Sequence, residues 1–540
     1  MTNRFMFKLL SFLLLVALLA SSLFACFDED VGFTSPYPNN TTQQDGSSTS
    51  ASGSSSARPT TPTKPSGTTG GGNVNPDDEH YDVDNDGYCD NCSIDVVETL
   101  DFYNFNDLHG KLEDTDSQPG IDELTTYLEN RVGVDEHTIF LSSGDMWQGG
   151  SASNATHGKI ITDWMNYLGF EAMALGNHEF DWGQDAIRVN EELAEFPFLA
   201  INIYDNATGK RVDYCDASVM IERGGCKIGI IGAIGDCYSS ILSEMTKGIH
   251  FKVGNELTNL VKAESEKLRG EGADIIVYLL HDGTTYRDLT TDGYYDDSLS
   301  SGGYVDLVFE GHSHSYYIFR DDYNVPHLQG GGDNSKGMTH VEVEVNFANG
   351  NIEFITTNYV QHSSCSSLEG SPAIDDLINK YWSEISWIYE NLGYNSSFRS
   401  SSTIGSTVAR LYYEAGIAKW GEEYDIVLAG GSINTRSPYD LSSGYVKYAD
   451  LQMLLPFDNA LYLCSIKGSD LKSKFINNGD YYVYSKISTS KINDNQTYYI
   501  IADSWTALYA WAKCTPIEKY DETTFARDLL AQYIKDGNWE

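Results

Sequence analysis

Short apolar runs alternate with amphipathic stretches along the middle of the chain. Five of these runs have the length of a buried strand: Leu100–Phe105, Thr138–Ser142, Ala172–Leu175, Ile275–Leu280 and Val305–Phe309. Helical stretches lie between them, and one of these, Leu257–Arg269, is followed by a glycine, as is common where a helix ends. A repeated strand–loop–helix order predicts a layered α/β domain.

A second block begins after a change in composition near residues 363–371. Apolar residues then recur at helical spacing, which predicts an amphipathic helix that joins two domains. The residues with this spacing are Ile374, Leu377, Ile378, Tyr381, Trp382, Ile385, Ile388, Tyr389 and Leu392. We therefore expect a first domain at 97–362, a linker helix within 363–395, and a second, smaller α/β domain at 396–540.

The first 76 residues are expected to address and tether the protein. Residues 1–26 combine a positive start, an apolar run and the sequence Leu-Phe-Ala-Cys, which resembles a bacterial lipobox that ends at Cys26. We expect Cys26 to carry a lipid that anchors the protein at the cell membrane, outside the cytoplasm. The alternative is a cleaved secretory signal in which Cys26 has no role. Residues 27–76 are rich in Ser, Thr, Gly and Pro, which predicts a flexible tether.

Residues 77–96 form an acidic loop whose spacing resembles that of a calcium site. The carboxylates concerned are Asp82, Asp84, Asp86 and Asp90. Three of them alternate before Gly87, as at the start of a calcium-binding loop, but Ser93 stands where a bidentate Glu is expected. Calcium at 82–90 is one interpretation. The others are a different metal or a small disulfide at Cys89 and Cys92, with His80 as a further ligand, or an acidic turn without an ion.

Composition and charge exclude several classes of protein. The chain has 540 residues, of which 41% are hydrophobic, enough for packed cores in more than one domain. Its formal net charge of −43 argues against binding nucleic acid through phosphate neutralisation. Nine cysteines are too few for a disulfide scaffold, and spacing alone leaves their pairing open.

Each of the five predicted strands ends in a polar cluster. The clusters are Asn106–Gly110, Ser143–Asp145, Gly176–Asp181, His281–Gly283 and Glu310–His314. Loops at the carboxyl ends of strands converge over the sheet in layered α/β folds, so we expect these clusters to form one site. All twelve histidines lie at or before His362, which confines imidazole chemistry to the first domain.

The His and carboxylate side chains of these clusters suit divalent transition metals such as Zn, Mn, Fe or Co. We expect two ions, with Asp145 as the ligand that bridges them. One ion would be bound by Asp107, His109 and His314, and the other by Asn177, His281 and His312. If the backbone at His312 and His314 is extended, both side chains point the same way. A single motif of this kind is usually structural, but five clusters at five strand ends are hard to explain as scattered polar residues.

The order of these motifs resembles the calcineurin-like metallophosphoesterases. The sequence Gly-Asn-His-Glu-Phe-Asp at 176–181 is similar to that of the extracellular 5′-nucleotidase / UDP-sugar hydrolase / 2′,3′-cyclic phosphodiesterase family. The resemblance implies a four-layer αββα sandwich followed by a smaller α/β C-terminal domain that binds the substrate. It implies the same two ligand sets around Asp145, a catalytic role for His178, and Asp181 as the residue that orients it. Glu179 is expected to be structural.

The resemblance is looser in the second domain. The sequence Leu-Pro-Phe-Asp-Asn resembles a family segment whose aromatic residue stacks on the base, which implies substrate contacts for Phe457 and Asn459. The alternative is a core phenylalanine beside a turn. Arg436 is expected to bind phosphate, and Trp505 to be the second aromatic contact. Leu508–Trp511 replaces the glycine-rich segment that follows in the family, so Trp505 could equally belong to the core.

Together these predictions describe an exported, lipid-anchored phosphoesterase with two metal ions. It would hydrolyse nucleotides through attack of metal-activated hydroxide on phosphorus. An alternative within the same class is a phosphodiesterase or pyrophosphohydrolase that acts on 2′,3′-cyclic nucleotides or nucleotide sugars. An alternative from another class is a non-catalytic surface protein that binds nucleotides, which would bind metal without turnover. No nucleic-acid partner is expected, and the lipid anchor would be the only contact with the membrane.

Overall fold

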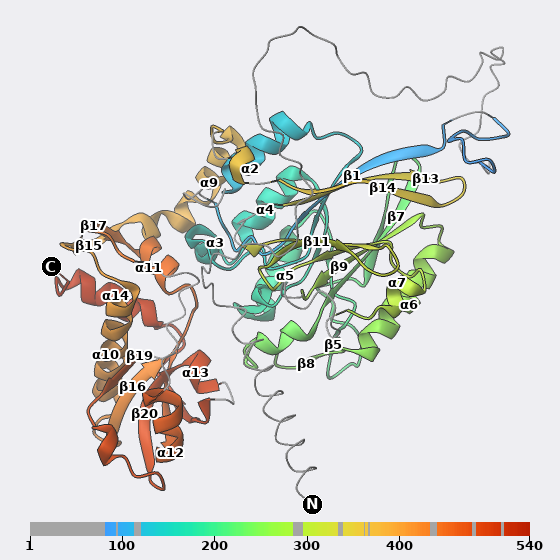
Figure 1. Ribbon diagram of the computed structural model, residues 1–540. Helices are drawn as coiled ribbons and strands as arrows, with labels where there is room; N and C mark the ends of the chain where they lie inside the picture. Colours follow the sequence, from blue (N-terminus) through green and yellow to red (C-terminus); the bar gives the residue numbers. More distant parts are fainter. Residues whose placement is uncertain are drawn as a thin grey trace, which may run out of the picture.

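The computed structural model contains two α/β bodies, a larger one in cyan to yellow and a smaller one in orange to red (Figure 1). It describes residues 81–92, 95–112, 120–283, 295–332, 338–360, 362–365, 368–431, 440–477, 482–508 and 512–539. Cys26, Arg436 and the 27–76 segment lie outside these residues, so the predictions made for them are not addressed by the fold. Among the described helices, none has both the length and the apolar content needed to cross a bilayer.

Two six-stranded sheets form the centre of the larger domain. The first sheet consists, in order, of β14 (Asn351–Tyr359), β13 (Thr339–Asn346), β1 (Val97–Phe105), β2 (Thr138–Ser142), β3 (Phe170–Ala174) and β4 (Phe198–Leu199). The second consists of β11 (Tyr316–Arg320), β12 (Pro326–Gly330), β10 (Leu307–Glu310), β9 (Ile275–His281), β7 (Cys226–Ile234) and β6 (Ser218–Arg223). The strands from β1 to β4 are parallel, as are β7, β9, β10 and β12.

Alternate residues of each strand reach opposite sides of its sheet, as a period of two requires. In β1, Leu100 and Phe102 join the core between the two sheets, whereas Phe105 joins the core under the helices. The helices that cover the first sheet are α2 (Ile121–Tyr127), α3 (Ser151–Thr156), α4 (Lys159–Leu168) and α5 (Gly183–Leu193). The second sheet is covered by α6 (Asn255–Gly270) and α7 (Ser298–Ser301). The predicted four-layer αββα sandwich is confirmed.

The chain then crosses to the smaller domain through α8 (His362–Cys365) and α9 (Pro372–Ile385). The Ser371 hydroxyl caps α9 by accepting a hydrogen bond from the amide of Ala373, and proline occupies the first turn. The helix is shorter than its apolar spacing predicts. It gives way to a 3₁₀ turn at Ser386–Tyr389 and to β15 (Asn391–Asn395), because the backbone there pairs with β17 (Gly444–Lys447) instead of with itself.

The smaller domain has a mixed five-stranded sheet. Its strands are, in order, β19 (Tyr482–Ser485), β16 (Ile426–Gly431), β20 (Thr497–Asp503), β18 (Leu461–Lys467) and β21 (Thr515–Lys519). Its longer helices are α10 (Ser401–Trp420), α11 (Tyr448–Leu454), α13 (Ser504–Leu508) and α14 (Ala526–Lys535). Helix α10 approaches the sheet closely at Gly416, where a Cβ atom would come within 2.3 Å of Ile501. This confirms the predicted smaller α/β domain.

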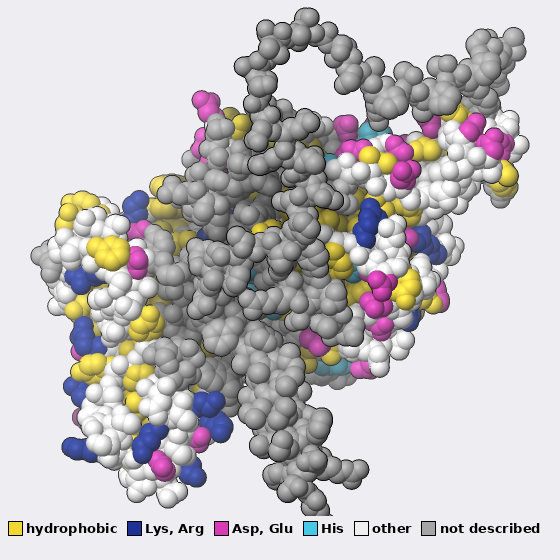
Figure 2. Space-filling model, viewed as in Figure 1, with side chains coloured by type: hydrophobic (Ala, Val, Ile, Leu, Met, Phe, Trp, Pro, Cys, Tyr) yellow, Lys and Arg dark blue, Asp and Glu magenta, His cyan; other side chains and the backbone are white. Residues whose placement is uncertain are grey.

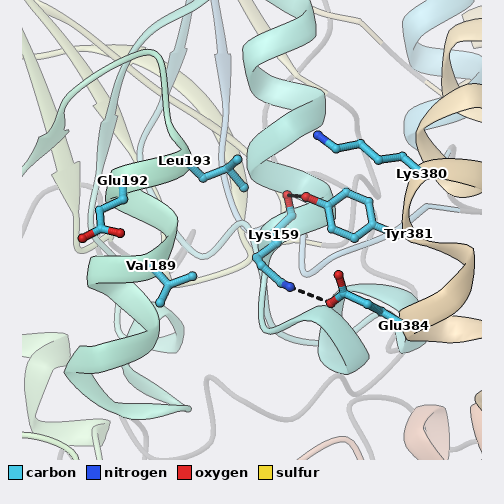
Figure 3. Close-up of a pocket in the computed structure, with 7 residues that line it drawn as sticks. All are labelled: Lys159, Val189, Glu192, Leu193, Lys380, Tyr381 and Glu384. Carbon is cyan, nitrogen blue, oxygen red and sulfur yellow. Dashed lines mark hydrogen bonds and ion pairs between the residues drawn. The ribbon is translucent and has the colours of Figure 1, made fainter.

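A surface pocket of about 400 Å³ lies where α9 meets α4 and α5 (Figure 3). It is lined by Lys159, Val189, Glu192, Leu193, Lys380, Tyr381 and Glu384. The Lys159 ammonium lies 2.5 Å from a Glu384 carboxylate oxygen, and the Tyr381 hydroxyl donates to the Asp163 carboxylate over 2.6 Å. These polar groups already have partners, so the pocket belongs to a joint that fixes α9 against the larger domain.

The negative charge of the protein is unevenly distributed. Residues after position 395 contain 14 Lys and Arg against 17 Asp and Glu, so nearly all of the net charge of −43 lies earlier in the chain. Figure 2 shows Lys and Arg side chains spread over the visible face of the smaller domain, whereas Asp and Glu gather at the far end of β1, around the acidic loop. The smaller domain is therefore the less repulsive of the two toward an anion.

Candidate metal centre

The loops after five strands hold the predicted ligands, and their backbone is strained there. Asp107, His109, Asp145, His312 and His314 have φ values between 50° and 73°. They are five of the nine non-glycine residues with positive φ in the described part of the chain. A side chain in this left-handed region costs on the order of 1 kcal/mol, and such strain collects at functional sites. The backbone at His312 and His314 is therefore not extended, and their side chains turn into different groups.

The first group consists of Asp107, His109 and His314, whose ligand atoms lie within 4.8 Å of one another. The Nε2 atoms of the two histidines are 3.0 Å apart, and the Nε2 atom of His314 is 3.7 Å from Oδ1 of Asp107. The Nδ1 atom of His109 contacts the carbonyl oxygen of Gln148 over 2.8 Å, which leaves Nε2 to face the group. This is the ligand set predicted for one ion.

The second group forms around the side-chain oxygen of Asn177. This oxygen lies 2.8 Å from Nδ1 of His312 and 3.2 Å from Nε2 of His281. The other ring nitrogen of His281 contacts the carbonyl oxygen of Ser143 over 2.7 Å, which orients the ring. The three side chains predicted to bind the other ion are thus brought together.

Asp145 lies between the two groups. Its Oδ1 accepts a hydrogen bond from the amide of His178, and its Oδ2 is 3.2 Å from Nε2 of His281. Oδ2 is buried and, apart from this pair with His281, has no hydrogen-bond partner among the described residues. An orphaned carboxylate oxygen amid imidazole and carboxylate donors fits a divalent metal, so the residues present suit the two ions that the sequence predicts.

The electrostatics of the centre show how closely these groups are coupled. Burial opposes ionisation of Asp145, but His281 and His178 hold its pKa well below the usual range. Burial likewise opposes charge on His281, yet Asp145 raises the pKa of this imidazole to about 10. A histidine must lose its proton to bind a metal, so ion binding at this centre releases protons.

Glu179 braces the loops that carry the ligands. Its buried carboxylate accepts hydrogen bonds from the amides of Asp145, Met146 and Gly176, over 2.7 to 2.9 Å. Burial, and then the negative charge of Asp145, raise the pKa of Glu179 to about 7. Glu179 therefore has the structural role expected of it, because its one carboxylate accepts hydrogen bonds from three amides in two loops.

His178 and Asp181 lie at the edge of the centre. The Nδ1 atom of His178 is 2.8 Å from the Asp181 carboxylate, and its ring meets that of His109 edge-on at 5.3 Å. Both side chains are partly exposed. The carboxylate therefore fixes the imidazole while Nε2 remains the ring nitrogen that can meet a substrate.

The smaller domain closes this edge with the loop that carries Phe457. The Phe457 ring lies nearly parallel to that of His178, with 5.9 Å between the ring centres. The carbonyl oxygen of Pro456 accepts hydrogen bonds from the side-chain amides of Gln148 over 3.1 Å and Asn154 over 3.4 Å. Both donors belong to the larger domain, so the metal loops and the aromatic loop are joined directly.

Arg527 holds the aromatic loop from the other side. This buried guanidinium donates to the carbonyl oxygens of Leu455 and Phe457, each over 3.2 Å, and pairs with the Asp458 carboxylate. Neither Arg527 nor Gln148 was predicted from the sequence. No local motif marks them, because their partners are hundreds or tens of residues away and are brought near only by the fold.

The other predicted substrate contacts lie beside this loop. Asn459 accepts a hydrogen bond from Ser504 over 3.1 Å through its side-chain oxygen, and Trp505, half-buried, follows at the start of α13. The hydrogen bond places Asn459 against the start of α13, the helix that carries Trp505. Arg436 lies outside the described residues.

The acidic loop lies far from the metal centre, beyond the start of β1 (Figure 1). Ligand oxygens of Asp82, Asp84 and Asp86 lie within 4.8 Å of one another. Asp82 is buried and accepts hydrogen bonds from the amides of Asp86 and Gly87, whereas Asp90 accepts one from the amide of Val83. The calcium interpretation stays a prediction, because these backbone contacts would also stabilise a turn without an ion.

A four-layer sandwich whose loop tips gather imidazole, amide and carboxylate ligands defines a metallophosphoesterase. The family model described as "Calcineurin-like phosphoesterase" matches residues 100–316, and the one described as "5'-nucleotidase, C-terminal domain" matches residues 388–500. Together the two matches span more than half of the chain. The protein belongs to the 5′-nucleotidase-like metallophosphoesterases, and is a hydrolase of that family.

Individual relatives agree with this assignment. The chain is 33% identical over 229 residues to the apyrase of Tabanus yao, an alignment that covers 40% of this chain and 39% of the apyrase. It is 23% identical over 465 residues to protein UshA of Yersinia enterocolitica, which covers 74% of this chain and 82% of UshA. The crystal structure of a 5′-nucleotidase precursor from Thermus thermophilus has the same fold, with a TM-score of 0.60, 16% identity, and coverage of 81% of this chain and 96% of that one.

Proposed function

We propose that this protein releases phosphate from nucleotides outside the cytoplasm, at a site with two divalent metal ions. The observation that carries the proposal is the convergence of seven candidate ligands from five loops, next to the pair formed by His178 and Asp181. The names of the relatives, apyrase and 5′-nucleotidase, support nucleotides as the substrate class.

One ion would be held by Asp107, His109 and His314. The other would be held by Asn177, His281 and His312, and Asp145 would contact both ions. When bound, two such ions lower the pKa of water and stabilise charge on phosphoryl oxygens. The protein contributes a fixed ligand geometry, since Gln148 and Ser143 orient two of the imidazoles through their carbonyl oxygens.

His178 is the residue placed to act on the reacting phosphate ester. Its Nδ1 atom is held by Asp181, so its Nε2 atom would carry a proton to the leaving oxygen or stabilise the charge that develops there. Asp181 acts as a positioning residue for this imidazole.

The aromatic loop would hold the base. The Phe457 face offers stacking worth about 1–3 kcal/mol, which is tolerant of base identity, and Asn459 and Trp505 lie beside it. Remote carboxylates of the larger domain are screened beyond about 8 Å at physiological ionic strength, so the acidity of the chain does not prevent an anionic substrate from binding.

The location is a separate part of the proposal. The segment that ends at Cys26 supports export and a lipid anchor at the membrane, and the 27–76 segment would serve as the tether.

The deciding experiment measures phosphate release by the purified protein from AMP, ADP and ATP, and the monoester products formed from UDP-glucose, NAD and 2′,3′-cAMP. The protein is first stripped with a chelator and then loaded with Mn²⁺, Zn²⁺ or Co²⁺. We expect release from nucleoside phosphates that depends on the added metal. Stoichiometric metal binding with no turnover of any of these compounds would identify a binding protein instead.

A further inference from the structure

A thiol from a sixth loop borders the metal centre. Cys237 follows β7, in the 3₁₀ turn at Asp236–Ser240, and only 6% of its surface is exposed. Its Sγ atom and one ring nitrogen each of His281 and His312 all lie within 4.8 Å of one another. None of the five motifs that predict the metal ligands includes this residue.

The turn that carries Cys237 is held rigidly against the ligand loops. The amide of Gly235 donates to the carbonyl oxygen of His281 over 3.1 Å, and the amide of Asp236 donates to the buried Asp282 carboxylate over 2.6 Å. A Cβ atom at Gly235 would come within 2.1 Å of that same carboxylate, so no larger residue fits there. The thiol itself lies 2.9 Å from the carbonyl oxygen of His281.

A second feature of this region also points to a cation. The Oδ2 atom of Asp145 is buried, lies 3.2 Å from Nε2 of His281, and has no hydrogen-bond partner in the described part of the chain. The imidazoles of His281 and His312 therefore have the Asn177 amide oxygen and the buried Asp145 carboxylate oxygen as neighbours, and the Cys237 thiol as a further one. Thiolate is a soft ligand that favours zinc and cobalt over manganese and magnesium.

We propose that the Cys237 sulfur is an additional ligand on the His281/His312 side of the metal centre, and that it biases this side toward zinc-like ions. The inference rests on the two-metal part of the proposed function and deepens it by naming the class of ion. On coordination the S–H bond breaks, the sulfur lone pair is donated to the metal, and the proton passes to solvent. The contact with the carbonyl oxygen of His281 is given up in exchange.

The test is the absorption spectrum of the full-length protein loaded with Co²⁺, because a cobalt–thiolate bond has a charge-transfer band in the near ultraviolet. The variants are Cys237→Ser and, as a matched control, Cys215→Ser, whose thiol is 7% exposed and contacts the carbonyl oxygen of Ala200 instead. We expect the band in the wild type and in Cys215→Ser, and its loss in Cys237→Ser while the visible cobalt bands remain.

Two results would overturn the inference. One is a wild-type protein that binds two Co²⁺ ions but shows no charge-transfer band. This result is informative even if the Cys237→Ser variant fails to fold. The other is a band that persists in Cys237→Ser, which would come from another thiol such as Cys89 or Cys92.

Selectivity gives a second readout. Loss of the thiolate should weaken Zn²⁺ binding roughly 10–100-fold and leave Mn²⁺ binding almost unchanged, as competition titrations would show. An equal loss for both ions would mean that the thiol only supports the loop. A protein that shows the cobalt band but hydrolyses no nucleotide would contradict the proposed function and leave this inference standing.

Discussion

The chemistry proposed for this protein depends first on single side chains whose backbone is held in a strained conformation. Five of the seven candidate metal ligands have positive φ, and Glu179 holds the amides of two loops in place. Strain of this kind persists only where surrounding contacts determine the geometry, so the centre is preorganised before any ion binds.

The role of His178 can be separated from that of the ligands. His178→Asn removes the proton carrier but leaves the seven ligands, so we expect full metal content and a fall in kcat of about 10²–10⁴-fold. Steady-state kinetics and elemental analysis of the same sample give both quantities. Asp181→Asn is the companion variant and should lower kcat by a smaller factor. Unchanged turnover in His178→Asn would remove this residue from the mechanism.

Elements of the two domains meet at the aromatic loop. From the larger domain, Gln148 and Asn154 donate hydrogen bonds to Pro456. From the smaller domain, Arg527 donates to the loop. A further contact joins the domains nearby, where the Ser151 hydroxyl in α3 donates to the carbonyl oxygen of Ala449 in α11 over 2.9 Å. The loop is thus fixed by contacts that span about 300 residues of sequence, which positions an aromatic ring over His178.

This arrangement predicts a substrate-specific effect of Phe457→Ala. Loss of stacking should raise KM for nucleotides about 10-fold, whereas KM for p-nitrophenyl phosphate, which has no base, should change little. Michaelis–Menten kinetics with AMP and with p-nitrophenyl phosphate provide the comparison. Equal effects on the two substrates would show that Phe457 supports the loop and does not contact the base.

A buried ion pair links β12 to β10 and makes stability depend on pH. The Nδ1 atom of His327 is 2.8 Å from the Glu310 carboxylate, and Nε2 is 3.6 Å from that of Asp321. Burial opposes the charge, but the two carboxylates raise the pKa of His327 to about 9, above the unfolded value near 6.5. A raised pKa stabilises the fold fully below pH 6.5, and this contribution is lost as pH rises through 9.

We therefore expect the free energy of unfolding of the wild type to fall between pH 6.5 and 9 by an amount on the order of 3 kcal/mol. The His327→Gln variant should lack this decrease. Urea unfolding at several pH values measures it. His250→Gln changes an exposed histidine and serves as the control. Parallel pH profiles for the wild type and His327→Gln would contradict the prediction.

At the scale of the whole molecule, the protein divides its tasks between its parts. The larger domain holds the candidate metal ligands and most of the negative charge, whereas the smaller domain, almost neutral, supplies the aromatic loop. Helix α9 contacts the larger domain through the pair between Glu384 and Lys159 in α4.

The proposed anchor makes a prediction at this scale. Cys26→Ser removes the lipidated residue, so a protein that partitions into the detergent phase should become water-soluble while its specific activity stays the same. Detergent phase separation followed by an activity assay measures both. A variant that partitions like the wild type would show that Cys26 carries no anchor.

Periodicity and local motifs in the sequence were enough to predict much of this molecule. The five strands were placed within a few residues, and β2 matches its prediction at Thr138–Ser142, because strands buried on both faces appear in the sequence as continuous apolar runs. The seven candidate ligands were also selected from the sequence, because each lies in a polar cluster that follows a predicted strand, and the structure brings them together.

Tertiary structure alone decided the rest, because it depends on contacts between residues far apart in the chain. The left-handed backbone at His312 and His314, the early end of α9, and the long-range contacts of Gln148, Arg527 and Cys237 all arise this way. No local pattern distinguishes these residues from ordinary ones. They acquire partners only when two sheets and a second domain bring separate loops to the same place.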